Sequence, residues 1–250
     1  MTRLEGKRAI VTGGGSGMGA ALVTLLCKDG ASVLAADVNE AGLEAVAAAT
    51  GCATRRTDIT SETENVAMVE AAVARFGGLD LVFLNAGILG RPIPDQMEPL
   101  TDVASVGQGY RSVMSVNLDG VVFGTLAAVT AMQGSGSIVV TASAAGLVPW
   151  PPDPAYTVSK HGAVGWVRSI APALEQHGIA INAICPGAVD TPLIDVPGYA
   201  DDLPRLEPSQ AAEAMVATAL DGETGRAVSV VAGRDPICAT HEFNELLGFS

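Results

Sequence analysis

A phenol and an ammonium group stand four residues apart in this chain, at Tyr156 and Lys160. On a helix, residues at this spacing lie on one face, so their ends can approach each other. A free tyrosine has a pKa near ~10 and is a poor base at pH 7, although a nearby cation favours the phenolate. Lowering that pKa by about 3 units requires roughly 4 kcal/mol. A surface lysine alone would not supply this, so the pair indicates acid–base chemistry only in a desolvated site with a second positive charge.

A glycine-rich stretch supplies a context for that charge. Residues 12–19 read Thr-Gly-Gly-Gly-Ser-Gly-Met-Gly, between an apolar run at 7–12 and a helical pattern at 20–29. Glycines let backbone amides approach a pyrophosphate, and the following helix N-terminus adds a favourable dipole. A loop that is merely flexible would not require a strand before it and a helix after it. The stretch therefore predicts a dinucleotide site, and an oxidised nicotinamide carries the positive charge that the Tyr156–Lys160 pair requires.

A second apolar run, at residues 31–37, ends in an acid. Asp37 lies 18 residues beyond Gly19. In a strand–helix–strand unit, such an acid accepts hydrogen bonds from the adenosine ribose and repels a 2′-phosphate. No Arg or Lys stands in the glycine loop or just after Asp37 to hold that phosphate. We therefore expect NAD rather than NADP, and an additional role for Asp37 as a helix N-cap is compatible with this.

The composition argues against several classes of function. The chain of 250 residues carries a formal net charge of −13, with a pI of about 4.5, which disfavours binding to nucleic acid or anionic membranes. Its four cysteines and three histidines show no metal-ligand spacing, so we expect no metal. The N-terminus lacks the apolar core of a signal peptide, and no apolar run reaches membrane-spanning length without Gly or a charge. We expect a cytoplasmic protein with reduced thiols.

Apolar strands alternate with helical stretches along the whole chain. Strands are expected at residues 7–12, 31–37, 52–58, 79–84, 136–142, 179–185 and 226–232. Helices are expected at 20–29, 40–49, 62–76, 112–132, 156–177 and 208–220, whereas the Pro- and Gly-interrupted stretch 91–111 has no clear assignment. The alternation predicts an α/β fold, a doubly wound parallel sheet (Rossmann fold) with helices on both faces, in one domain over residues 1–250.

Together these motifs resemble those of the short-chain dehydrogenase/reductase family. Residues 12–19 are similar to the family's TGxxxGxG loop, and residues 85–87 read Asn-Ala-Gly like its NAG motif. The order and approximate spacing of the family's catalytic tetrad are matched by Asn117, Ser143, Tyr156 and Lys160. Its PG segment and downstream threonine are matched by Pro186, Gly187 and Thr191. The resemblance covers essentially the whole chain, and it is carried by motifs that stand in the correct order.

For the reaction, the resemblance implies hydride transfer between a secondary alcohol and a ketone. Tyr156 would be the general base in alcohol oxidation and the acid in carbonyl reduction. Ser143 would hydrogen-bond the same substrate oxygen. Lys160 would lower the pKa of Tyr156 and bind the nicotinamide ribose. Asn117 would hold a water that links Lys160 to solvent.

For the ligands, the resemblance implies two sets of residues. The pyrophosphate would be lined by Gly13, Ser16, Gly17, Met18 and Gly19, with Asp37 at the ribose and Asp58 and Ile59 at the adenine. The rest of the cofactor site would comprise Asn85, Ala86, Gly87, Tyr156, Lys160, Pro186, Gly187, Val189 and Thr191. The substrate pocket is expected to include Ser143, Ala145, Trp150, Tyr156 and Leu193, which suits a small neutral alcohol or ketone.

Departures from the family pattern leave the substrate and the subunit packing open. The segment 192–204, where the family has a substrate lid, is short, the stretch between Asn85 and Asn117 is slightly long, and residues 230–233 read Val-Val-Ala-Gly. Two alternatives remain, a 3-oxoacyl thioester reductase that uses NADPH and a non-catalytic dinucleotide-binding protein. The family suggests a homotetramer, with the long helices after Ser112 and Tyr156 as candidate interfaces.

Overall fold

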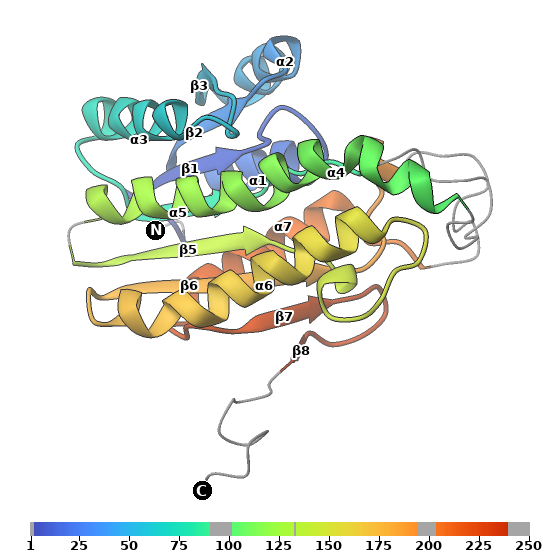
Figure 1. Ribbon diagram of the computed structural model, residues 1–250. Coiled ribbons are helices and arrows are strands. Elements are labelled where there is room, and N and C mark those ends of the chain that lie inside the picture. Colours follow the sequence, from blue (N-terminus) through green and yellow to red (C-terminus); the bar gives the residue numbers. More distant parts are fainter. Residues whose placement is uncertain (1–2, 91–101, 133, 195–203, 240–250) are drawn as a thin grey trace, which may run out of the picture.

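One eight-stranded sheet runs through the computed structural model, which describes residues 3–90, 102–132, 134–194 and 204–239 (Figure 1). Its strands are β1 (Arg8–Thr12), β2 (Ser32–Asp37), β3 (Ala53–Arg56), β4 (Leu81–Leu84), β5 (Gly136–Thr141), β6 (Ile179–Pro186), β7 (Ala227–Val230) and β8 (Ile237–Cys238). They lie in the order β3-β2-β1-β4-β5-β6-β7-β8, and every pair is parallel except β7 with β8. The strand order reverses between β1 and β4, and ligands of open α/β sheets bind at the carboxyl ends of strands beside such a reversal.

Helices cover both faces of this sheet. They are α1 (Gly17–Lys28), α2 (Glu40–Thr50), α3 (Glu62–Phe76), α4 (Val106–Met114), α5 (Gly120–Ala131), α6 (Pro154–Glu175) and α7 (Pro208–Leu220). The apolar residues of α3, α5 and α6 pack with one face, and those of α1, α2 and α7 pack with the other. In β1, Ile10 belongs to the first cluster whereas Ala9 and Val11 belong to the second. This alternation follows the period of two in a strand that is buried on both faces.

The predicted fold class is confirmed, but several element bounds were wrong. The helix expected at 112–132 begins earlier, at Val106, and consists of α4 and α5 joined by a π-helical turn, Ser115–Asp119. Helix α6 begins at Pro154 because Asp153 caps it, and proline is well tolerated in a first helical turn. The antiparallel strand β8 was not predicted, since two residues carry no readable pattern. Most of the stretches 91–111 and 192–204 lies outside the described residues.

One helical stretch has the composition of a membrane span. Gly109–Ala131 is long and apolar enough to cross a bilayer by length and composition. Its second half is α5, which contacts α3 and β4 and contributes Val121, Ala127 and Ala128 to the core. Burial against the sheet accounts for the apolar residues on one side of α5, whereas Leu126 on the same helix is 50% exposed.

Candidate active site

Side-chain hydrogen bonds tie together the carboxyl ends of β1, β4 and β5. Thr12 Oγ1 accepts the backbone N–H groups of Asn85 and Ala86, at 3.0 and 3.2 Å. In return Asn85 Nδ2 donates to the carbonyl of Thr12 at 3.1 Å, and Asn85 Oδ1 accepts from the hydroxyl of Thr141 at 3.2 Å. These bonds fix the loops that follow the strands at the point where the strand order reverses.

The glycine loop after β1 requires glycine for its geometry. Gly13 and Gly17 have φ of +66° and +49°, a region that other residues rarely adopt. A Cβ on Gly13 would lie 2.8 Å from Ala86 Cα, and one on Gly19 would lie 2.0 Å from the Gly13 carbonyl oxygen. Gly19 is buried behind the loop, so its contribution is the close approach of α1 to the loop rather than a surface for a ligand.

The N-terminus of α1 is open to an anion. Its N-cap, Ser16, makes no side-chain capping bond, and no acid stands in the first turn. Helices α2 and α3 differ, because Asn39 and Ser61 cap them with side-chain oxygens and glutamates stand in their first turns. Free amides at the positive end of a helix dipole suit a pyrophosphate. This end of the site therefore fits the diphosphate of a dinucleotide.

A cleft of about 240 Å³ begins at this helix end. Among the predicted cofactor residues it is lined by Gly13, Ser16, Gly17, Met18, Asp37, Asp58, Ile59, Asn85, Ala86, Gly87 and Thr191. The carboxylate of Asp37 accepts the N–H of Gly15 and the N–H of Asn39, both at 2.9 Å, which fixes it at the mouth of the loop. Hydrogen bonds from Thr60 lower the pKa of Asp58, so that this carboxylate stays ionised.

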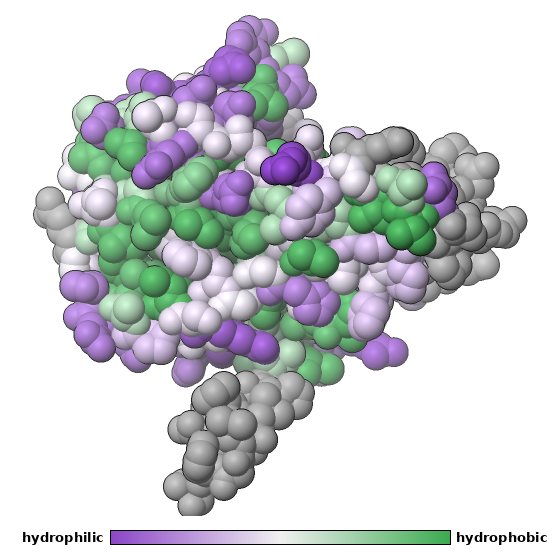
Figure 2. Space-filling view, in the orientation of Figure 1, coloured by the Kyte–Doolittle hydropathy of each residue, from purple (hydrophilic) through white to green (hydrophobic). Residues whose placement is uncertain are grey.

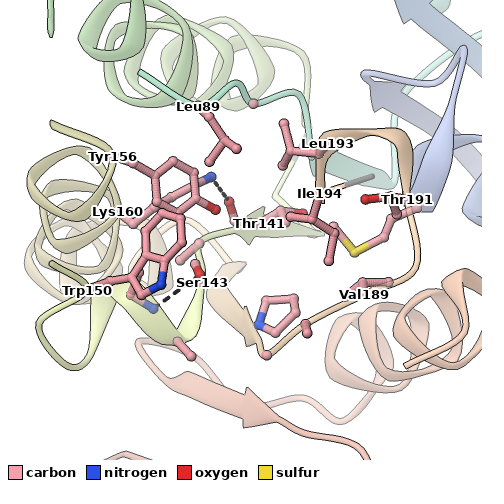
Figure 3. Close-up of a pocket in the computed structure, with 18 of the residues that line it drawn as sticks. Leu89, Thr141, Ser143, Trp150, Tyr156, Lys160, Val189, Thr191, Leu193 and Ile194 are labelled. Carbon is pink, nitrogen blue, oxygen red and sulfur yellow. Dashed lines mark hydrogen bonds between the residues drawn. The ribbon is translucent and has the colours of Figure 1, made fainter. Parts of the chain in front are cut away.

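A second cavity of about 260 Å³ (Figure 3) adjoins the cleft and shares Met18, Asn85, Gly87, Thr191 and Leu193 with it. It brings together the predicted residues Ser143, Ala145, Trp150, Tyr156, Lys160, Pro186, Gly187, Val189, Thr191 and Leu193. Ile194 also lines the cavity, and the lining residues that the sequence did not predict are Leu89, Thr141, Ala142, Ala144 and Ala188. Lys160 is the only charged residue in the described lining, so the cavity suits a neutral ligand.

The phenol of Tyr156 and the ammonium of Lys160 lie in one wall of this cavity. Tyr156 is 8% exposed, and its ring meets the ring of Trp150 edge-on, with centroids 5.7 Å apart. Lys160 Nζ lies 5.5 Å from the centroid of the Tyr156 ring and donates to the carbonyl of Thr141 at 2.7 Å. The spacing of four residues on α6 therefore places the two groups as the sequence predicted.

Burial controls the charge of this wall. Lys160 is 3% exposed, and desolvation lowers its pKa to about 8. The ammonium is then still the main form at pH 7 and can favour an adjacent phenolate. The nearby Cys185 behaves in the opposite sense, because burial raises the pKa of its thiol to about 11. At neutral pH the thiol is therefore uncharged and does not neutralise the ammonium of Lys160. That ammonium remains available to favour the phenolate of Tyr156.

Asn117 lies in the π-helical turn, fully buried, behind this wall. Its Oδ1 accepts the N–H of Ile88 at 2.9 Å, and its Nδ2 donates to the carbonyl of Ile88 at 2.9 Å and to Ser159 Oγ at 3.1 Å. Both amide hydrogens are therefore used by the protein. A Cβ on Gly87 would lie 3.3 Å from both Asn117 Oδ1 and Lys160 Nζ, so the missing side chain leaves a gap between them. A water that links the two would donate to an oxygen of Asn117.

Ser143 follows β5 and begins a short 3-10 turn, Ala144–Gly146. Its Oγ accepts the N–H of Ala145 at 3.1 Å, which directs the side chain towards the cavity (Figure 3). As a hydroxyl it retains a hydrogen to donate to a ligand oxygen. Ser143 and Tyr156 thus provide two polar groups in a cavity that is otherwise mostly apolar.

Two residues that shape the site were missed at the sequence level. Thr141 holds Lys160 through its carbonyl and Asn85 through its hydroxyl. Asp153 caps α6 and also reaches Gly90 across the chain. Asp153 could have been found, since an Asp before a Pro is a common helix start. The role of the Thr141 carbonyl had no signal, because any residue type supplies a carbonyl.

Comparisons with known proteins agree with this geometry. A sequence model described as short chain dehydrogenase matches residues 7–196. The chain is 44% identical over 199 residues to 2,5-dichloro-2,5-cyclohexadiene-1,4-diol dehydrogenase of Sphingobium indicum, covering 78% of this chain and 77% of the relative. It is 34% identical over 240 residues to levodione reductase of Leifsonia aquatica, covering 92% and 86%, and 38% identical over 199 residues to cyclohexanol dehydrogenase of an Acinetobacter species, covering 77% and 76%.

Solved structures give the same result. A crystal structure of levodione reductase superposes with a TM-score of 0.83 at 30% identity, covering 92% of this chain and 98% of that one. A 3-ketoacyl-(acyl-carrier-protein) reductase from Brucella melitensis, complexed with NADH, has a TM-score of 0.83 at 29% identity, covering 92% and 99%.

The chain belongs to the short chain dehydrogenase family. It is an oxidoreductase that acts on CH–OH groups, interconverting a secondary alcohol and a ketone with a nicotinamide dinucleotide.

Proposed function

We propose that this enzyme uses NAD and acts on a small, neutral, cyclic secondary alcohol or the corresponding ketone, with Tyr156 as the acid–base group. The observation that carries the proposal is the juxtaposition of Tyr156, Ser143 and the buried Lys160 in one wall of an apolar cavity beside the glycine loop. The named substrates of the relatives, which include cyclohexanol, support a ring of this size.

The roles of the protein groups follow from their positions. Ser143 donates a hydrogen bond to the substrate oxygen, and Tyr156 takes the proton from that oxygen during oxidation or returns it during reduction. Lys160, held on the Thr141 carbonyl, stabilises the phenolate by its charge. A bound oxidised nicotinamide supplies the hydride acceptor. The apolar wall of Leu89, Trp150 and Ile194 excludes water and orients the ring of the substrate.

The preference for NAD rests on the charges around Asp37. The β2–β3 register places Arg56 opposite Asp37. Arg56 forms ion pairs with Glu40 at 3.6 Å and Glu64 at 3.9 Å. This arginine is therefore already paired, and Asp37 itself would repel the 2′-phosphate of NADP.

A cofactor comparison tests this preference. We expect kcat/KM with NAD to exceed kcat/KM with NADP by at least about tenfold. This factor corresponds to the free energy of one charge-assisted hydrogen bond, which NADP would lose. In Asp37→Ser the ratio should fall by a similar factor while kcat with saturating NAD stays within about threefold, since Asp37 is remote from the hydride. A parent enzyme that favours NADP would refute the role given to Asp37.

A substrate panel tests the reaction itself. Cyclohexanol and a cyclic diol should be oxidised with NAD, and an acetoacetyl thioester with NADPH should be a poor substrate. Tyr156→Phe removes the acid–base group without changing the ring, and should lower kcat by about 10²–10⁴-fold with a much smaller change in the affinity for NAD. Near-normal turnover by this variant, or a strong preference for the thioester, would overturn the proposal.

The proposal extends to assembly and location. Figure 2 shows apolar side chains gathered on the face where α5 and α6 lie, and Leu126 and Val158 on these helices are each 50% exposed. Such a patch favours burial against another copy of the chain, as in a homotetramer in the cytoplasm. Sedimentation analysis of the parent and of Leu126→Asp tests this, since a monomeric parent would refute it.

A further inference from the structure

Asp153 is a buried carboxylate that the proposed chemistry does not use. It is 2% exposed and lies directly before α6. Its Oδ1 accepts the backbone N–H of Tyr156 at 2.9 Å, and its Oδ2 accepts the backbone N–H of Gly90 at 2.6 Å. None of the ion pairs between described residues involves Asp153. Two amides and the positive end of the α6 dipole therefore stabilise the charge.

Asp153 joins three separate parts of the cavity wall, two through its carboxylate and one through its backbone. Gly90 directly follows Leu89, a lining residue that comes from the chain after β4. The backbone N–H of Asp153 itself donates to the carbonyl of Trp150 at 3.3 Å, and Trp150 lines the cavity from the loop after β5. Tyr156 lines it from the first turn of α6. The relative positions of Leu89 and Tyr156 therefore depend on the side chain of Asp153, and that of Trp150 depends on its backbone N–H.

The contact with Gly90 is close on both sides. A Cβ on Gly90 would lie 3.0 Å from Asp153 Oδ1, and a Cβ on Gly109 of α4 would lie 1.8 Å from the Gly90 carbonyl oxygen. The loop that carries Leu89 is thus packed between α4 and the carboxylate. A small change in the hydrogen bonding of Asp153 would move Leu89 relative to Tyr156, since no free space separates the elements.

We propose that Asp153 is a positioning residue, which sets the distance between the Leu89 wall and Tyr156 and thereby the fit of the substrate ring. The inference rests on the proposed function in taking Tyr156 as the acid–base group. The helix cap alone does not require a carboxylate, because Asn caps helices as well as Asp does. The bond to Gly90 does require it, because both partners of Asp153 are N–H donors and an amide has a single acceptor oxygen.

Asp153→Asn separates the two bonds. It keeps the side-chain volume and the cap on Tyr156, but it places an amide donor against the Gly90 donor. Asp80→Asn is the matched control, since it makes the same change in a carboxylate that pairs with Arg8 where β1 and β4 begin, at the opposite end of the sheet from the cavity. The readouts are KM and kcat for cyclohexanol, the dissociation constant of NAD, and the fluorescence of Trp150 without ligands in a Trp166→Phe background, where it is the sole tryptophan.

We expect Asp153→Asn to raise KM for cyclohexanol at least about tenfold, the value of one charge-assisted hydrogen bond, with kcat within about threefold and NAD affinity unchanged. The emission of Trp150 should shift, and Asp80→Asn should leave all four readouts at the parent values. If Asp153→Asn does not fold, Gly90→Ala tests the same contact, because its Cβ would lie 3.0 and 3.2 Å from the two oxygens of a carboxylate that is itself kept. This variant should raise KM by a smaller factor.

Two results would overturn the inference. One is an unchanged KM and unchanged Trp150 emission in Asp153→Asn, or in Gly90→Ala where it is the variant measured. The other is a loss of NAD affinity in Asp153→Asn that matches the rise in KM, or an equal effect of Asp80→Asn. Either would indicate that the substitution disturbs the whole fold and not the cavity wall alone. If the parent does not oxidise cyclohexanol, the proposed function fails on that substrate, while the ligand-free emission of Trp150 still decides the role of Asp153.

Discussion

The N-termini of α1 and α6 both border the active site, but they differ in whether a side chain caps the first backbone amides. At α1, Ser16 leaves the first amides without a side-chain cap and no acid is near in sequence. At α6, the buried carboxylate of Asp153 already occupies the positive end of the helix. The difference separates two tasks, because an open helix end attracts an anion whereas a neutralised one does not. In the proposed function, the dinucleotide's phosphates therefore bind at α1 and the neutral substrate binds at α6.

The largest effect that we expect at these two helix ends is on the free energy of unfolding, and it comes from Lys160, the buried cation on α6. Lys160 has a pKa of about 8 in the folded protein against 10.5 in the unfolded chain, so its ammonium opposes folding below pH 8. This penalty, about 3 kcal/mol, is relieved as pH rises from 8 towards 10.5, with a slope of up to ~1.4 kcal/mol per pH unit. We expect the free energy of unfolding of the ligand-free enzyme to rise between pH 8 and 9.

The slope is measured by urea unfolding at several pH values, with Lys160→Met as the comparison. In that variant the rise between pH 8 and 9 should disappear. The window stops at pH 9 because Cys185 acts in the opposite direction above it: burial raises the pKa of its thiol from 9 to about 11, so stability falls as the unfolded thiol ionises. Equal slopes in parent and variant would show that Lys160 is not desolvated.

A smaller effect should follow from closing the space behind the open helix end. In Gly19→Ala the new Cβ would lie 2.0 Å from the carbonyl oxygen of Gly13, so the glycine loop must move. We expect calorimetry to show NAD binding weakened by about a hundredfold, near 2.7 kcal/mol, since the amides no longer point at one place. Gly107→Ala, in an exposed part of α4 with no neighbour within 4 Å, should leave NAD binding unchanged.

The smallest effect comes from making α1 resemble α6. Ser16→Asp places a carboxylate at the open N-terminus, which should stabilise the ligand-free protein by about 0.3–1 kcal/mol through the helix dipole. The same charge should weaken NAD binding by about five- to tenfold, because it competes with the pyrophosphate. Thermal unfolding and calorimetry measure the two changes. Tighter NAD binding by Ser16→Asp would contradict the assignment of the phosphates to α1.

The sequence predicted the α1 side of the site more fully than the α6 side. Residues 12–19 form one continuous loop, and Tyr156 and Lys160 lie on one helix, so local patterns are enough to find them. The bond from Gly90 to Asp153 spans 63 residues, and the bond from Thr141 to Asn85 spans 56. Contacts of this kind depend on which strands become neighbours. The fold class was predicted because alternating strands and helices allow few arrangements, whereas the start of α4 and strand β8 lacked a comparable pattern.

The π-helical turn at Ser115–Asp119 also has a consequence for how this chain can change. An α-helix advances about 100° per residue, and a π turn accommodates one residue more than an α turn. The extra residue therefore leaves α4 and α5 facing as they would in a regular helix one residue shorter, with α4 against α6 and α5 against α3 and β4. Deleting one residue of this turn would restore a regular helix with these faces in place, whereas winding the same residues as a regular α-helix would rotate one half against the other by about 100°. This segment should therefore tolerate the loss of one residue from the turn better than a substitution of Asn117, whose buried amide bonds Ile88 and Ser159.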